Sequence, residues 1–126
     1  MGEPGNSQHI VLLVESNPSL LSLLSNVLGR EGYLVLAARN SENALKLCAE
    51  VAGIDLLVTD IFLPGASGID LARRFAQLNP NAKILYLSSI AEEALRLQGI
   101  GNEASVLVKP IAISDLVARI HELLRS

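Results

Sequence analysis

The chain has 126 residues, of which 50% are hydrophobic and 18% are charged. This length suits one compact domain, and this apolar content excludes an intrinsically disordered chain. The net charge of −3 gives no reason to expect a nucleic-acid partner, and the apolar runs are too short to span a membrane.

Residues 1–8 precede the first apolar run and contain two glycines, one proline, Asn6 and Ser7. They have neither a basic segment nor a long apolar core, so they do not resemble a signal peptide. We expect residues 1–8 to be a flexible leader and residues 9–126 to form the domain. The single cysteine, Cys48, cannot form an internal disulfide, which favours a reducing, cytoplasmic location.

Short apolar runs recur along the chain and have the character of buried strands. Their hydrophobicity is continuous rather than alternating, which predicts strands covered on both faces, as in a parallel sheet. We expect strands at residues 10–14, 33–37, 54–58, 84–87 and 105–108.

Apolar residues at helical spacing fill the segments between these runs. Asn40 or Ser41 is the expected cap of the second helix, and Ser114 that of the last. The pair Asn79-Pro80 ends the third helix, because the residue before a proline avoids helical geometry. We expect helices at residues 20–28, 44–51, 67–78, 92–98 and 116–124.

Strands and helices therefore alternate as βαβαβαβαβα. This order predicts an α/β fold, a three-layer sandwich in which helices cover both faces of a parallel sheet. Right-handed crossovers leave few topologies, and we expect the flavodoxin-like strand order 2-1-3-4-5. Ligands of such sheets bind outside the carboxyl ends of the strands where the strand order reverses, here between the first and third strands.

Polar residues gather at that predicted sheet edge. Glu15 and Ser16 follow the first strand, Asp60 follows the third, and Ser88 and Lys109 follow the last two. An ionised carboxylate can accept a phosphoryl group, and the transfer needs its oxygens neutralised, usually by a divalent cation and a lysine. Carboxylates are the protein ligands that Mg²⁺ prefers. The pattern therefore favours phosphoryl transfer to a carboxylate.

Four motifs carry a family resemblance and span nearly the whole chain: VLLVESNP at 11–18, LLVTDIFLPGASG at 56–68, LSS at 87–89 and VKP at 108–110. Together they resemble the response-regulator receiver domain of two-component signalling, the CheY-like family. The resemblance implies a module that takes a phosphoryl group from a histidine kinase or phosphotransfer protein and signals by a conformational shift. It implies no enzyme activity beyond self-catalysed phosphoryl transfer and dephosphorylation.

Carried over to this sequence, the resemblance makes Asp60 the phosphoacceptor. Lys109 and Ser88 fall on the positions that contact the phosphoryl group. The resemblance also implies a cis peptide bond between Lys109 and Pro110.

The resemblance further implies that Mg²⁺ is held by Glu15, Asp60 and the backbone carbonyl of Phe62. Two positions depart from the family pattern. Ser16 stands where the family usually has Asp, and because a hydroxyl is a poor Mg²⁺ ligand we expect weakened metal binding. Val106 stands where the family often has a mobile aromatic ring, so that ring cannot report phosphorylation here.

The expected reporting face comprises the fourth helix, the fifth strand and the fifth helix. It would contact an output domain or a second copy of the chain, and we expect neither nucleic acid nor membrane as a partner of this domain. Ala94, Leu95 and Leu97 on the fourth helix are candidates for this contact or for packing on the sheet. The sequence does not choose between a stand-alone receiver and a piece of a longer regulator or hybrid kinase.

Two other functions stay open. The first is a phosphorylation-independent interaction module with weakened metal binding, which Ser16 and Val106 favour. The second is a small flavodoxin-like enzyme or cofactor carrier, against which the absence of glycine-rich phosphate-binding motifs argues. A helical His followed by an acid also occurs at sensor-kinase phosphorylation sites, but we expect His121, beside Glu122, to be an ordinary exposed helix residue.

Overall fold

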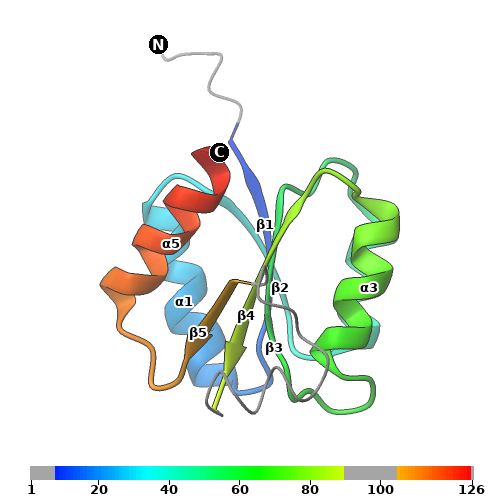
Figure 1. Cartoon of the computed structure of the whole chain (residues 1–126), viewed down its shortest axis with the longest axis horizontal. Helices are drawn as coiled ribbons and strands as arrows, with labels where there is room; N and C mark the ends of the chain where they lie inside the picture. Colours follow the sequence, from blue (N-terminus) through cyan, green and yellow to red (C-terminus); the bar gives the residue numbers. More distant parts are fainter. Residues whose placement is uncertain (1–7, 90–104, 126) are drawn as a thin grey trace.

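A computed structural model describes residues 8–89 and 105–125 of the chain (Figure 1). Its five strands form a parallel sheet in the order β2-β1-β3-β4-β5, which confirms the predicted topology. The predicted fourth helix, with Ala94, Leu95 and Leu97, lies outside the described residues. The elements are β1 (Ile10–Val14), α1 (Pro18–Arg30), β2 (Leu34–Ala38), α2 (Ser41–Glu50), β3 (Leu56–Asp60), α3 (Gly68–Leu78), β4 (Lys83–Ser88), β5 (Ser105–Val108) and α5 (Ile113–Arg125).

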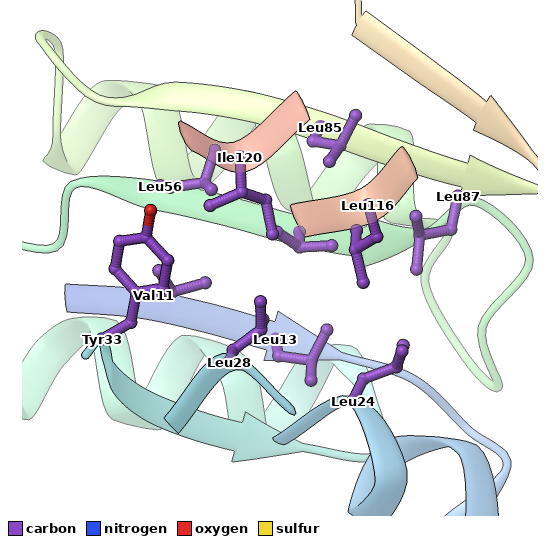
Figure 2. Close-up of a cluster of buried hydrophobic side chains, with 11 residues drawn as sticks. Val11, Leu13, Leu24, Leu28, Tyr33, Leu56, Leu85, Leu87, Leu116 and Ile120 are labelled. Carbon is purple, nitrogen blue, oxygen red and sulfur yellow. The ribbon is translucent and has the colours of Figure 1, made fainter. Parts of the chain in front are cut away.

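Helices cover both faces of the sheet, with α1 and α5 on one side and α3 on the other (Figure 1). Successive strand residues point to opposite faces, so β1 places Val11 and Leu13 toward α1 and α5, and Leu12 and Val14 toward α2 and α3. Burying one such side chain contributes about 1.5–3 kcal/mol. Figure 2 shows the first of these layers, whose fully buried members include Leu24, Leu28, Leu116 and Ile120.

Some boundaries differ from the predicted ones. Ile54 is buried but precedes β3, which begins at Leu56, and the Asp55 carboxylate between them accepts the Ile10 N–H at 2.8 Å. The predicted third strand was therefore two residues early, and Asp60 is the last residue of β3 rather than the residue beyond it. The prediction that Ser114 caps the last helix was also wrong, because α5 begins at Ile113 and Ser114 lies in its first turn.

Side-chain caps fix where the helices begin. Of the two expected caps of α2, Asn40 is the one used, and its side chain accepts the Asn43 N–H. The Ser41 hydroxyl instead donates to the Ala66 carbonyl at 2.8 Å, which ties α2 to the loop after β3. Ser67, predicted as the first residue of the third helix, is the cap of α3.

A polar cluster joins α5 to the segment between α1 and β2. The Tyr33 hydroxyl is hydrogen-bonded to Nδ1 of His121, and Nε2 of His121 lies 3.1 Å from Glu31 Oε1. The prediction that His121 is an ordinary exposed helix residue was therefore wrong, since its ring is partly buried between these two groups.

Tyr33→Phe should lower the free energy of unfolding by about 1 kcal/mol, because it removes one hydrogen bond and leaves the His121 nitrogen without it. Urea denaturation followed by circular dichroism measures the change. Tyr86→Phe is the matched control, since the Tyr86 hydroxyl makes no hydrogen bond within the described ranges. Equal losses in both variants would contradict the role given to the Tyr33 hydroxyl.

Candidate functional site

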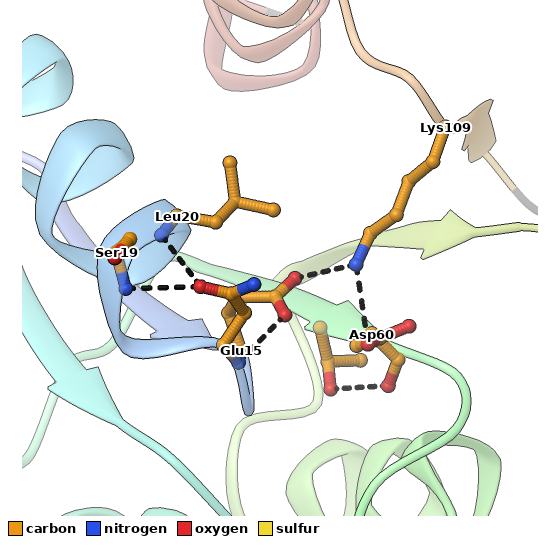
Figure 3. A network of polar contacts seen from close by, with 7 residues as sticks. Glu15, Ser19, Leu20, Asp60 and Lys109 are labelled. Carbon is orange, nitrogen blue, oxygen red and sulfur yellow. Dashed lines mark hydrogen bonds and ion pairs between the residues drawn. The ribbon is translucent and has the colours of Figure 1, made fainter.

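Three of the predicted side chains meet at the carboxyl ends of the strands (Figure 3). Parallel pairing sets Val14 of β1 opposite Thr59 of β3, so Glu15 and Asp60 occupy the next position on neighbouring strands. Lys109 enters from the end of β5 and places Nζ 2.8 Å from Glu15 Oε1 and 3.3 Å from Asp60 Oδ2. The site is thus a pocket of two carboxylates and one ammonium group.

Glu15 is held in place by both its backbone and its side chain. Its N–H donates to the Ala38 carbonyl at 3.1 Å, and its Oε2 accepts the Asn17 N–H at 3.0 Å. The Asn17 side chain in turn caps α1 by accepting the N–H groups of Ser19 and Leu20 (Figure 3). The start of α1 therefore fixes the carboxylate, which is 1% exposed.

The loop after β3 holds Asp60 from the other side. The Ile61 N–H donates to the Leu87 carbonyl at 3.1 Å, and the Gly68 N–H donates to the Ile61 carbonyl at 2.7 Å. The backbone N–H of Phe62 lowers the pKa of the Asp60 carboxyl, and Phe62 itself is 51% exposed. The use of the Phe62 carbonyl as a metal ligand stays a prediction.

Ser88 lies next to Lys109 at the ends of the last two strands. Ser88 is fully buried and pairs in register with Val108, and its carbonyl accepts the Lys109 N–H at 2.6 Å. The Lys109–Pro110 peptide bond is cis, as the resemblance implied. The structure therefore places Ser88 at the same sheet edge as Asp60 and Lys109.

Val106 and Tyr86 face each other across β4 and β5. The two residues are register partners, and both pack against Ile61, which directly follows Asp60. The aromatic ring at this place thus belongs to Tyr86 on β4, and position 106 on β5 has none. Sequence reasoning about the site did not single out Tyr86, although its spacing of two residues from Ser88 on one strand sets both on the same face.

Burial and charge shift the protonation of two groups in the pocket. Burial raises the pKa of the Asp60 carboxyl, and the Glu15 charge raises it further, against the lowering effect of Lys109. Burial by itself lowers the pKa of Lys109, but the hydrogen bond to Glu15 and the charge of Asp60 outweigh it, so this pKa is raised. Lys109 therefore stays protonated in the folded chain, whereas ionisation of the Asp60 carboxyl costs more free energy in the folded chain than in the unfolded one.

Asp60→Asn should consequently raise the free energy of unfolding at neutral pH, by on the order of 1 kcal/mol. A carboxyl whose pKa is raised by folding gives stability that is present below its unfolded pKa and lost as pH rises through its folded pKa. The gain should therefore vanish in acid. Urea denaturation at several pH values measures it, and the exposed Asp70→Asn should instead lose stability, because it removes a charge at the start of α3.

The donors of the pocket fit Mg²⁺ in chemical type. Mg²⁺ is held by one or two carboxylates and keeps several waters, and Glu15 with Asp60 supplies two. Within residues 8–89 and 105–125 no group of three or more His, Cys, Asp or Glu side chains is placed to hold a metal. Ser16 adds no third carboxylate, so Glu15 and Asp60 are the two that Mg²⁺ could use at this site.

A comparison with protein families identifies the chain. The family model described as the response regulator receiver domain matches residues 11–121. The chain belongs to the response-regulator receiver family. As a receiver it is a signalling module of two-component systems rather than a classic enzyme, and the family implies a histidine kinase as its partner.

Known receivers resemble this chain in sequence and structure over most of its length. The receiver protein CpdR of Brucella abortus is 34% identical over 115 residues, which cover 90% of this chain and 95% of the relative. The transcriptional regulator CpxR of Klebsiella pneumoniae is 35% identical over 91% of this chain, which spans only 49% of that longer protein. The crystal structure of a receiver protein from Sinorhizobium medicae superposes with a TM-score of 0.85 at 27% identity and covers 95% of this chain and 97% of that one.

No helix in the described part of the receiver has the length and apolar character needed to cross a membrane.

Proposed function

We propose that this receiver accepts a phosphoryl group on Asp60 from a histidine kinase or phosphotransfer protein in the cytoplasm. The observation that supports this most is the position of the Asp60 carboxylate, which lies 3.3 Å from the Lys109 ammonium at the strand ends of a receiver fold. It is 11% exposed, so a donor can reach it from the open edge of the sheet. The resulting acyl phosphate shifts the domain between two conformations.

In the transfer, an Asp60 carboxylate oxygen forms a bond to phosphorus as the bond from phosphorus to the donor imidazole nitrogen breaks. The electron pair of the broken bond stays on that nitrogen, which takes a proton from solvent. Lys109 neutralises charge on the phosphoryl oxygens, because its ammonium already lies beside the acceptor oxygen. Ser88, at the end of the neighbouring strand, donates a hydrogen bond to the attached phosphoryl group.

Mg²⁺ would be held by the carboxylates of Glu15 and Asp60 and by the Phe62 carbonyl. When bound, it supplies positive charge to the phosphoryl oxygens during transfer. Ser16 lowers the number of charged ligands, so this receiver should need more Mg²⁺ than one with Asp at that position.

Signalling to a partner would pass through β4 and β5. Lys109 is hydrogen-bonded through its backbone to Ser88, so a shift of either side chain toward a phosphoryl group moves the end of both strands. β5 and α5, with the fourth helix expected from the sequence, would then contact an output domain or a second copy. Val106 provides no ring for this step.

The experiment is intact-mass measurement after incubation with acetyl phosphate, with and without Mg²⁺. The chain should gain the mass of one phosphoryl group when Mg²⁺ is present, Asp60→Asn should gain none, and the exposed control Asp70→Asn should be labelled normally. Labelling that persists in Asp60→Asn would show that another residue is the acceptor.

The alternative is a receiver-like interaction module that works without phosphorylation. Its support is that both oxygens of Glu15 are already engaged, by Lys109 and by the Asn17 N–H, and that Ser16 offers no charge. Absence of labelling at saturating Mg²⁺, in a chain shown to be folded, would favour this module.

A further inference from the structure

Glu15 is the most enclosed of the three charged groups in the pocket. Its side chain is 1% exposed, against 11% for Asp60 and 22% for Lys109. Oε1 accepts from Lys109 and Oε2 accepts from the Asn17 N–H, so each oxygen already has a donor. A second cation at this carboxylate would therefore lie beside the Lys109 ammonium or displace it.

Lys109 lies closer to Glu15 than to the carboxylate of the acceptor residue. Its Nζ is 2.8 Å from Glu15 and 3.3 Å from Asp60. A divalent cation bound by both carboxylates would lie close to the ammonium that now contacts one oxygen of each, and two cations at such a separation repel each other. Among the residues that the structure describes, no other Lys or Arg forms an ion pair with either carboxylate.

The Asn17 contact is the less exchangeable of the two. The Asn17 N–H belongs to the backbone at the start of α1, whereas the Lys109 side chain is flexible and partly exposed. A metal that approaches Glu15 therefore displaces the ammonium rather than the amide.

We propose that Lys109 is the resident cation of this pocket and competes with Mg²⁺ for the Glu15 carboxylate. Mg²⁺ binds Glu15 only when Lys109 turns from Glu15 toward Asp60 or the group attached to it. Lys109 thereby sets the metal requirement of the receiver, in addition to the missing carboxylate at Ser16. This inference deepens the proposed function, because it concerns the ion that would assist the phosphoryl transfer.

The test measures Mn²⁺ binding, as a stand-in for Mg²⁺, by electron paramagnetic resonance of the free ion, with no phosphodonor present. Lys109→Met should bind Mn²⁺ at least about tenfold more tightly than the unaltered chain, because the competing cation is gone. Lys83→Met is the matched control, since it removes the same charge from an exposed position at the opposite end of β4. Its affinity should stay within about twofold of the unaltered value.

The Glu15→Gln background shows whether the competition is for Glu15. There, Lys109→Met should change the Mn²⁺ affinity by less than about threefold, or neither variant should bind measurably. A tenfold gain that persists in this background would overturn the proposal, because Lys109 would then act through Asp60 alone. Unchanged or weaker binding by Lys109→Met in the native background would overturn it as well.

Lys109→Met leaves Glu15 without its ion-pair partner and needs a check of folding by circular dichroism. If it is unfolded, Lys109→Gln replaces it, because the amide can still donate to Glu15 without carrying charge. Lys109→Gln should then also bind Mn²⁺ more tightly than the unaltered chain. The outcome is independent of phosphorylation. If acetyl phosphate does not label the unaltered chain but Lys109→Met still binds Mn²⁺ more tightly, the acceptor role of Asp60 is rejected and this inference stands.

Discussion

Gly68→Ala is expected to reduce the free energy of unfolding by about 3 kcal/mol, or to prevent folding. A Cβ at position 68 would lie 2.0 Å from the Asp60 carbonyl oxygen and 3.0 Å from Cα of Ile61. Both are backbone atoms, so no side-chain rotation relieves the overlap. The Gly68 N–H also donates to the Ile61 carbonyl at 2.7 Å, so α3 cannot move away without losing that bond.

Urea denaturation of Gly68→Ala measures this loss, and Gly29→Ala is its control. Gly29 lies in α1, where a Cβ would meet nothing within 4 Å beyond the adjoining backbone of its own helix, so alanine there should be neutral or stabilise by up to about 1 kcal/mol. Because the overlap is with Asp60 itself, any folded Gly68→Ala should also label poorly with acetyl phosphate. Equal stabilities of the two variants would contradict the close approach of α3 to Asp60.

The meeting of Glu15, Asp60 and Lys109 is the part of the site that the sequence predicted best. Parallel strands end at one edge of the sheet, so residues that follow neighbouring strands come together once the strand order is right. The strand order itself followed from alternating elements and right-handed crossovers. The residues at that edge could be recognised in the sequence, because a charged residue directly after an apolar strand stands out in a largely apolar chain.

The contacts within the pocket were not predictable in this way. Whether Lys109 lies nearer to Glu15 or Asp60 is decided by half an ångström, which no residue pattern encodes. The start of β3 was misplaced for a related reason, since Ile54 is apolar and buried yet outside the strand pairing. His121 was misjudged because its partner Tyr33 is distant in sequence, and helical periodicity carries no signal for such a contact.

Lys109→Met is expected to lower the free energy of unfolding at neutral pH by about 3–5 kcal/mol. The Glu15 carboxylate would stay enclosed and keep its hydrogen bond from the Asn17 N–H, but its charge would be uncompensated. The ammonium also lowers the pKa of Asp60, so its removal should raise that pKa beyond the effect of burial. A neutral methionine of similar length keeps the packing, which assigns the loss to charge.

The pH dependence separates charge from packing in this variant. A carboxyl with a raised pKa, as Asp60 has, gives the folded chain stability that returns as pH falls through its folded pKa, so Lys109→Met should recover part of its loss in acid. In the unaltered chain the raised pKa of Lys109 gives stability that is present below its unfolded pKa and lost as pH rises through its folded pKa. The difference between the two proteins should therefore narrow in acid and in strong alkali, as measured by urea denaturation. If the difference in free energy of unfolding between the two proteins does not change with pH, Lys109 supports the fold through its hydrocarbon chain. Lys109 would then not stabilise the pocket by compensating the charge of its carboxylates.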